Sequence, residues 1–83
     1  MLVPDEIACL KYLDNKMKAT GMMIGEAIAP ERAKSLRGYG MIGNRVARSL
    51  YLDRGGLTAY IAELQAWCIT PAGRAVIRAY PSK

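Results

Sequence analysis

The chain has 83 residues, which is enough for one small domain with a single hydrophobic core. Histidine is absent, which removes the commonest general base and the commonest zinc ligand, and the scattered carboxylates show no pairing typical of a catalytic site. No segment approaches the ~20 uncharged residues of a membrane span, and no basic signal-peptide start precedes Pro4-Asp5-Glu6. We therefore expect one cytoplasmic domain over residues 1–83 that is not an enzyme, has no cofactor or metal and does not bind a membrane.

The positive charge is concentrated in one segment of the chain. The formal net charge is +5, and residues 32–54 hold all of it. This segment contains six basic residues and one acidic residue, Asp53, whereas the basic and acidic residues in the rest of the chain are equal in number. The six are Arg32, Lys34, Arg37, Arg45, Arg48 and Arg54. A basic patch confined to one element is typical of a nucleic-acid-binding surface. A solvated loop that is basic by chance is the alternative.

That segment contains a predicted helix over about 41–53. At about 100° per residue, Ile42, Val46 and Leu50 share an apolar stripe that we expect to face the core. The nearly opposite face carries Asn44, Arg48 and Tyr51, with Arg45 on its flank. One side of this helix is thus expected to be core, and the other to meet a polyanion.

Glycines bound this helix on both sides. Gly38, Gly40 and Gly43 are expected to leave backbone N–H groups unshielded at its start, where a phosphate can bind. Gly55 and Gly56 are expected to end it.

Two shorter helices are predicted before it. Pro4 opens the first, over about 5–18, whose apolar positions at three- and four-residue steps are Ile7, Leu10, Leu13 and Met17. Thr20 caps the second, over about 21–29, whose apolar stripe is Met23, Ile24, Ala27 and Ile28. Pro30 ends that helix, and residues 30–40 form a long turn in which Leu36 is the expected core anchor.

Residues 57–70 fit two patterns. As a helix, their apolar residues recur at three and four positions; as a hairpin, strands at 58–62 and 66–70 place Leu57, Ala59 and Ile61 on one face and turn Trp67 and Ile69 inward. We predict the hairpin because of the helix that follows it and because of the family resemblance given below. That helix, over about 71–80, is capped by Thr70, opens with Pro71, and carries Arg74 and Arg78 pointing away from the core.

Two features that can mark ligand sites are excluded by their context. Residues 38–43 match G-x-G-x-x-G, but no buried strand precedes them and the chain is too short for a dinucleotide-binding sheet. Cys9 and Cys68 lie far apart and outside any C-x-x-C pair, so we expect reduced, structural cysteines.

The run Trp67-Cys68-Ile69-Thr70-Pro71-Ala72-Gly73-Arg74-Ala75 resembles the W-x-[IL]-T-P-A-G-R-A segment of bacterial and phage winged helix-turn-helix proteins, including MarR-like ones. Residues 20–28 look like the family's second helix, and Gly56-Leu57 like the end of its recognition helix. The resemblance implies a mainly α fold with a small β-hairpin: a three-helix core, a two-stranded wing and a C-terminal helix. It also implies DNA binding by a transcriptional regulator. The chain departs from the family in its long turn and in a wing without a basic tip.

Two functions follow from these observations. In the first, double-stranded DNA is the partner, and the helix at about 41–53 reads the major groove. Its expected DNA-binding residues are Lys34, Arg37, Tyr39, Asn44, Arg45, Arg48, Arg54 and Gln65. Arginine pairs with guanine and asparagine with adenine, so Arg48 and Asn44 are assigned to base edges. The other basic residues, Lys34, Arg37, Arg45 and Arg54, are assigned to phosphates. In the alternative, the basic face docks on an acidic protein, for example as a phage product that inhibits a host machine. A homodimer is left open in both.

Overall fold

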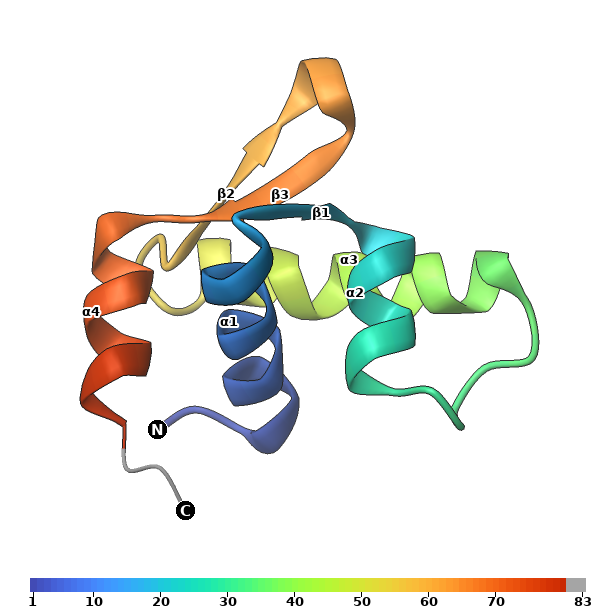
Figure 1. Ribbon diagram of the computed structural model, residues 1–83, viewed down its shortest axis with the longest axis horizontal. Coiled ribbons are helices and arrows are strands. Elements are labelled where there is room, and N and C mark those ends of the chain that lie inside the picture. The colour runs from blue at the N-terminus through green and yellow to red at the C-terminus, as the bar shows by residue number, and fades with distance from the viewer. Residues whose placement is uncertain (81–83) are drawn as a thin grey trace.

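The computed structural model describes residues 1–80 and is mainly helical, with four helices and a small antiparallel sheet (Figure 1). The helices are α1 (Pro4–Lys16), α2 (Gly21–Ile28), α3 (Leu36–Leu52) and α4 (Pro71–Ala79). The strands are β1 (Lys18–Thr20), β2 (Thr58–Ile61) and β3 (Ala66–Ile69), in the order β1-β3-β2. The β2–β3 hairpin stands out from the helices. Within residues 1–80, none of the helices has the length and apolar character needed to span a membrane.

Helix α1 provides much of the core. Pro4 occupies its first turn, and Cys9, Leu10 and Leu13 are completely buried. The helix stops at Lys16 because Met17 takes a φ of 75°, a positive value that a right-handed helix cannot continue through. The expectation that the helix reached residue 18 with Met17 in the core was therefore wrong.

Strand β1 was not predicted. Its three residues pair with β3, Lys18 opposite Cys68 and Thr20 opposite Ala66. Only Ala19 of the three is buried, and its partner across the ladder is the buried Trp67. A three-residue strand is too short to show an alternating pattern in the sequence.

Helices α2 and α3 cross closely at glycines. Gly21 and Gly25 of α2 face α3, and a Cβ added to Gly43 would overlap the Gly21 carbonyl oxygen. Gly25 has the same relation to the Tyr39 carbonyl oxygen. The backbones thus occupy the space that side chains usually fill. Ile24 is completely buried as expected, but Met23 and Ala27, which were expected in the core, are exposed.

Helix α3 begins earlier than predicted. Ser35 caps it by accepting a hydrogen bond from the Gly38 N–H at 3.1 Å, so the turn is shorter than the expected 30–40. Leu36 is the first helical residue and is 59% exposed, not a core anchor. Gly40 and Gly43 lie inside the helix, which contradicts the expected open phosphate-binding start. Its end is as predicted, because Gly55 and Gly56 have φ values of 80° and 79°.

The hairpin prediction for residues 57–70 is confirmed. The bend is a short 3-10 turn, Ala62–Leu64, followed by Gln65 in a left-handed conformation with φ 50°. Trp67 and Ile69 face inward as expected. Their partners across the ladder are Tyr60 and Thr58, so the inner face of β2 is not the one expected from Leu57, Ala59 and Ile61. The Thr58 hydroxyl donates to the Ala47 carbonyl oxygen at 2.7 Å and ties β2 to α3.

Helix α4 is held by the residues of the T-P-A-G-R run. The Thr70 hydroxyl accepts from the Gly73 N–H at 3.1 Å and donates to the Gly56 carbonyl oxygen at 2.7 Å. A Cβ on Gly73 would overlap the Leu57 carbonyl oxygen, so glycine is needed at this close approach. The helix ends at Ala79; the expected role of Pro81 in ending the ordered chain lies outside the described residues.

Candidate functional site

Four of the seven arginines are engaged with carboxylates. Arg32 makes a bidentate pair with Asp5, with nitrogen–oxygen distances of 2.6 and 2.8 Å. Asp14 of α1 receives both Arg74 and Arg78 of α4, at 3.1 and 3.2 Å. These last two arginines point away from the core as predicted, with side chains 40% and 65% exposed, but their pairing with Asp14 connects the last helix to the first.

Arg54 is the fourth, and its role also differs from the prediction. Its guanidinium group contacts Glu6, with Nη2 at 3.0 Å from Oε1 and Nε at 3.1 Å from Oε2. Glu6 is only 3% exposed, so this pair lies at the edge of the core. Arg54 is thus a structural residue that fixes the end of α3 against α1, and we no longer assign it to a phosphate.

The three remaining arginines all lie on α3. Arg37, Arg45 and Arg48 are exposed, and within residues 1–80 no carboxylate oxygen lies within 4.0 Å of them. Together with Met41 and Leu52 they occur at steps of four, four, three and four, which places them along one exposed face of the helix. Lys34 is exposed just before this helix. We call Lys34, Arg37, Arg45 and Arg48 the basic face.

The face is rotated relative to the prediction. Gly43, Ala47 and Leu50 are the buried positions of α3, whereas Ile42 and Val46 are only partly buried. Arg45, which was expected on the flank, consequently lies in the exposed stripe. The cause is the close crossing at Gly43, which brings α2 onto a side of α3 that carries no apolar side chain there.

Asn44 turns inward as a result. Its side-chain oxygen accepts a hydrogen bond from the Trp67 indole N–H at 2.9 Å, and the side chain lies against Gly21. An asparagine that reads adenine needs both its oxygen and its nitrogen aimed at the base edge. Asn44 therefore positions Trp67 and the hairpin, and its assignment to a base edge is corrected.

Tyr39 and Gln65, which were also predicted to contact DNA, lie in different surroundings. The Tyr39 hydroxyl donates to the Pro30 carbonyl oxygen at 2.6 Å and so holds the turn before α3, in place of the expected DNA contact. Gln65 is exposed at the hairpin bend, where its assignment to DNA stays a prediction.

Comparison of the chain with protein-family models, curated proteins and solved structures found no significant match.

The surface beside the basic face is hollowed on both sides of Arg48. One shallow depression runs along α3, and a second, of about 320 Å³, lies between α3 and the hairpin. The first is lined by Arg37, Gly40, Met41, Asn44, Arg45 and Arg48. The second is lined by Asn44, Arg48, Tyr51, Leu52, Tyr60 and Trp67. Arg48 borders both, so it is the central cation of this surface.

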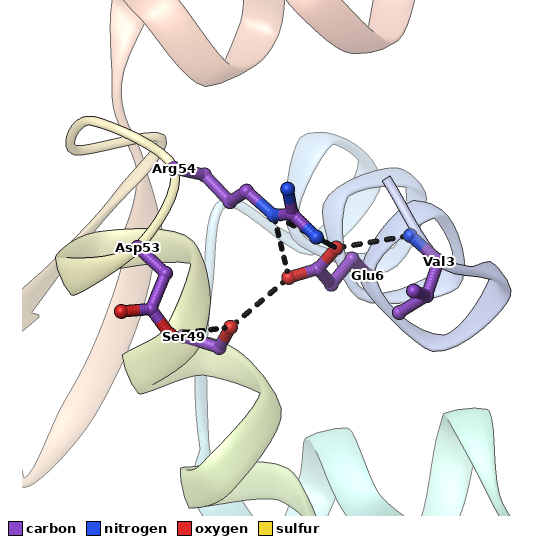
Figure 2. Close-up of polar contacts among 5 residues, drawn as sticks. All are labelled: Val3, Glu6, Ser49, Asp53 and Arg54. Atoms are coloured by element: carbon purple, nitrogen blue, oxygen red, sulfur yellow. Dashed lines mark hydrogen bonds and ion pairs between the residues drawn. The ribbon is translucent and has the colours of Figure 1, made fainter. Parts of the chain in front are cut away.

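Glu6 connects α1 to the end of α3, as Figure 2 shows. Its carboxylate accepts from the Val3 N–H at 3.0 Å, from the Ser49 hydroxyl at 3.0 Å and from Arg54. Burial alone would raise the pKa of Glu6, but the hydrogen bonds from Arg54, Val3 and Ser49 outweigh it and the pKa is lowered. The sequence placed Glu6 in the first turn of a helix but gave no sign of its partner 48 residues away.

This network makes stability depend on pH. Because the folded-state pKa of Glu6 lies below its ordinary value of 4.5, its contribution is complete above that pH and is lost as the pH falls below it. The pKa values of Asp5 and Asp14 are also lowered, and the largest cause is the hydrogen bond from Arg32 to Asp5 and from Arg78 to Asp14. Both carboxylates therefore also lose their stabilising contribution as the pH falls.

We predict that Glu6→Gln lowers the free energy of unfolding by roughly 1–3 kcal/mol at pH 7, between the values typical of exposed and of buried ion pairs. Its loss of stability below about pH 4.5 should be smaller than that of the wild type, because one linked proton is removed. Urea unfolding at pH 7 and pH 3.5 measures both. Glu26→Gln, at an exposed site on α2, is the control and should change neither; equal behaviour of the two variants would contradict the prediction.

Proposed function

We propose that the protein is a winged helix-turn-helix DNA-binding protein of the transcriptional-regulator type, and that α3 is its recognition helix. The fold supports this proposal through its element order, in which three helices and a short strand precede a hairpin and a final helix. One observation carries it. Every arginine outside α3 is paired with a carboxylate, whereas the three on the exposed side of α3 have no acidic partner within residues 1–80.

The spacing of these cations suits a helix in the major groove. That groove is about 12 Å wide and admits one α-helix. Arg48, which borders both depressions, is assigned to a base edge, where a guanidinium group can pair with the O6 and N7 atoms of guanine. Lys34, Arg37 and Arg45 are assigned to phosphates.

The hairpin contributes less to this binding. Its bend carries the exposed residues Glu63 and Gln65, and within residues 1–80 it has no cation. Gln65 can donate a hydrogen bond to DNA, but the carboxylate of Glu63 is repelled by phosphates. Most of the binding free energy is therefore expected from α3 and the turn before it.

The salt dependence of binding tests the proposal. If Lys34, Arg37 and Arg45 neutralise three phosphates, the logarithm of the association constant for random duplex DNA should fall with a slope near −2.7 against the logarithm of salt concentration. Between 50 and 200 mM salt this corresponds to about 40-fold weaker binding. Fluorescence anisotropy with a labelled duplex measures it, and a protein without measurable affinity at 50 mM salt would not be a DNA-binding protein of this kind.

A second candidate, an interaction module for an acidic protein, is favoured by the exposed apolar residues on the same face. Met41 and Leu52 are 57% and 64% exposed between and beside the arginines. Apolar contacts with cations around them are typical of protein interfaces as well as of DNA-binding helices. If DNA binding is absent at low salt, this candidate takes its place.

A further inference from the structure

Exposed apolar side chains line the cleft between α3 and the hairpin and also lie at the hairpin bend. Leu52 of α3 is 64% exposed and Leu64 of the hairpin bend is 51% exposed, with Tyr51 and Tyr60 both at 48%. Single exposed apolar residues are ordinary, but Tyr51, Leu52 and Tyr60 line one concave surface, and such a group marks an interaction site. Arg48, Tyr51, Leu52 and Tyr60 line this cleft, and Glu63 and Leu64 lie at the hairpin bend; we call these six residues together the hairpin cleft surface.

Its charges lie at opposite ends. Glu63 stands at the hairpin bend and Arg48 on α3, and neither takes part in an ion pair within residues 1–80. Each charge has an exposed leucine or tyrosine near it in the chain: Leu64 follows Glu63, and Tyr51 and Leu52 follow Arg48. Tyr60 lies between these ends on β2, with its ring 4.9 Å from that of Trp67. A two-fold rotation would therefore place acid opposite base and apolar opposite apolar.

The shape permits the same arrangement. The hairpin stands out above α3 in Figure 1. The hollow of about 320 Å³ is lined by residues of α3, β2 and β3. Strand β2 is at the edge of the sheet, so its outer backbone groups have no partner strand among residues 1–80. The hairpin of a second copy fits this hollow, since it supplies both an apolar tip and a strand edge.

We propose that two copies of this chain associate through their hairpin cleft surfaces, with Glu63 of each opposite Arg48 of the other and Leu64 against Tyr51 and Leu52. The contact is isologous, so each pairing occurs twice. The dimer contact covers Arg48, so DNA and a second copy of the chain would compete for this residue. That competition rests on the proposed function, but the dimer itself does not. DNA that binds the monomer would then shift the monomer–dimer equilibrium towards monomers.

A reciprocal charge exchange tests the pairing by sedimentation equilibrium in the absence of DNA. The wild type should show a monomer–dimer equilibrium below about 1 mM. Glu63→Arg and Arg48→Glu should each raise the dimer dissociation constant by about tenfold, because two attractive pairs become repulsive. The double variant restores attraction and should return to within about threefold of the wild type. Glu26→Arg makes the same charge change on α2 and should leave the constant unchanged.

The apolar contact is tested separately. Leu64→Glu should weaken the dimer by about tenfold or more, since it places a charge against Tyr51 and Leu52 in each half of the contact. Leu36→Glu, at a similarly exposed leucine outside the cleft, should not. Circular dichroism verifies that both stay folded. A wild type that is monomeric up to about 1 mM, or variants that match their controls, would overturn the proposal. These measurements contain no DNA, so their failure and a failure of DNA binding are distinguishable.

Discussion

Gly43→Ala should lower the free energy of unfolding by about 1–3 kcal/mol or more, the usual effect of inserting a methyl group into a filled core. The new Cβ would overlap the carbonyl oxygen of Gly21, and backbone atoms cannot move aside as the end of a side chain can. The two helices would have to separate, which would disturb the crossing that orients the basic face.

Gly40→Ala is the matched control, one helical turn earlier in α3. No atom lies within 4 Å of a Cβ added at Gly40, so only the backbone term remains. Alanine is favoured over glycine inside a helix by roughly 0.5–1 kcal/mol, and the variant should therefore be more stable than the wild type. Thermal unfolding should show shifts of opposite sign, about 4–8 °C per kcal/mol for a domain of this size. Equal shifts for the two variants would mean that the helices do not meet at Gly43.

The glycines also explain where sequence reasoning failed. The apolar pattern of residues 41–53 assigned the core side of the helix to Ile42, Val46 and Leu50, and only Leu50 is fully buried. The real contact is made by Gly43 and Ala47, which a hydrophobic pattern counts as neutral or weak. A small rotation of the helix followed, and it exchanged the expected positions of Asn44 and Arg45.

The local signals were more reliable. The caps at Thr20 and Thr70 and the helix end at Gly55 and Gly56 were all predicted, because each depends on residues within a few positions of one another. The hairpin was chosen over a helix for residues 57–70, and the structure confirms it. Strand β1 was missed, since its three residues form a strand only through their partner β3.

Pairing between distant charges could not be predicted. Residues 32–54 do carry an excess charge of +5, but two of their arginines form ion pairs with distant carboxylates. Arg32 pairs with Asp5, 27 residues away, and Arg54 with Glu6, 48 residues away. A sequence count treats all six bases of that segment alike. The structure separates them into structural arginines and the basic face, and so reduces the predicted DNA-binding set.

This separation yields the largest expected effect on binding. Arg37→Ala and Arg45→Ala should each flatten the salt slope for random duplex DNA by about one unit, because each removes one phosphate contact. Arg78→Ala removes the same formal charge from α4, where Arg78 is paired with Asp14 and lies outside the basic face, and should leave the slope unchanged. If net charge alone governed binding, all three variants would behave alike.

Arg48 is expected to behave differently from its neighbours on α3, because a base contact carries sequence information and a phosphate contact does not. Arg48→Ala should cost about 1–3 kcal/mol on the preferred sequence and relax the preference there. Arg48→Lys separates charge from geometry: lysine keeps the cation but lacks the planar fork that pairs with guanine, so binding to random DNA should persist while selectivity falls. Selection of binding sites from a random duplex library, followed by titration of the selected and a scrambled duplex, measures both quantities. If Arg48→Lys kept the full preference, Arg48 would be a phosphate contact, and sequence reading would have to come from another residue of the exposed stripe.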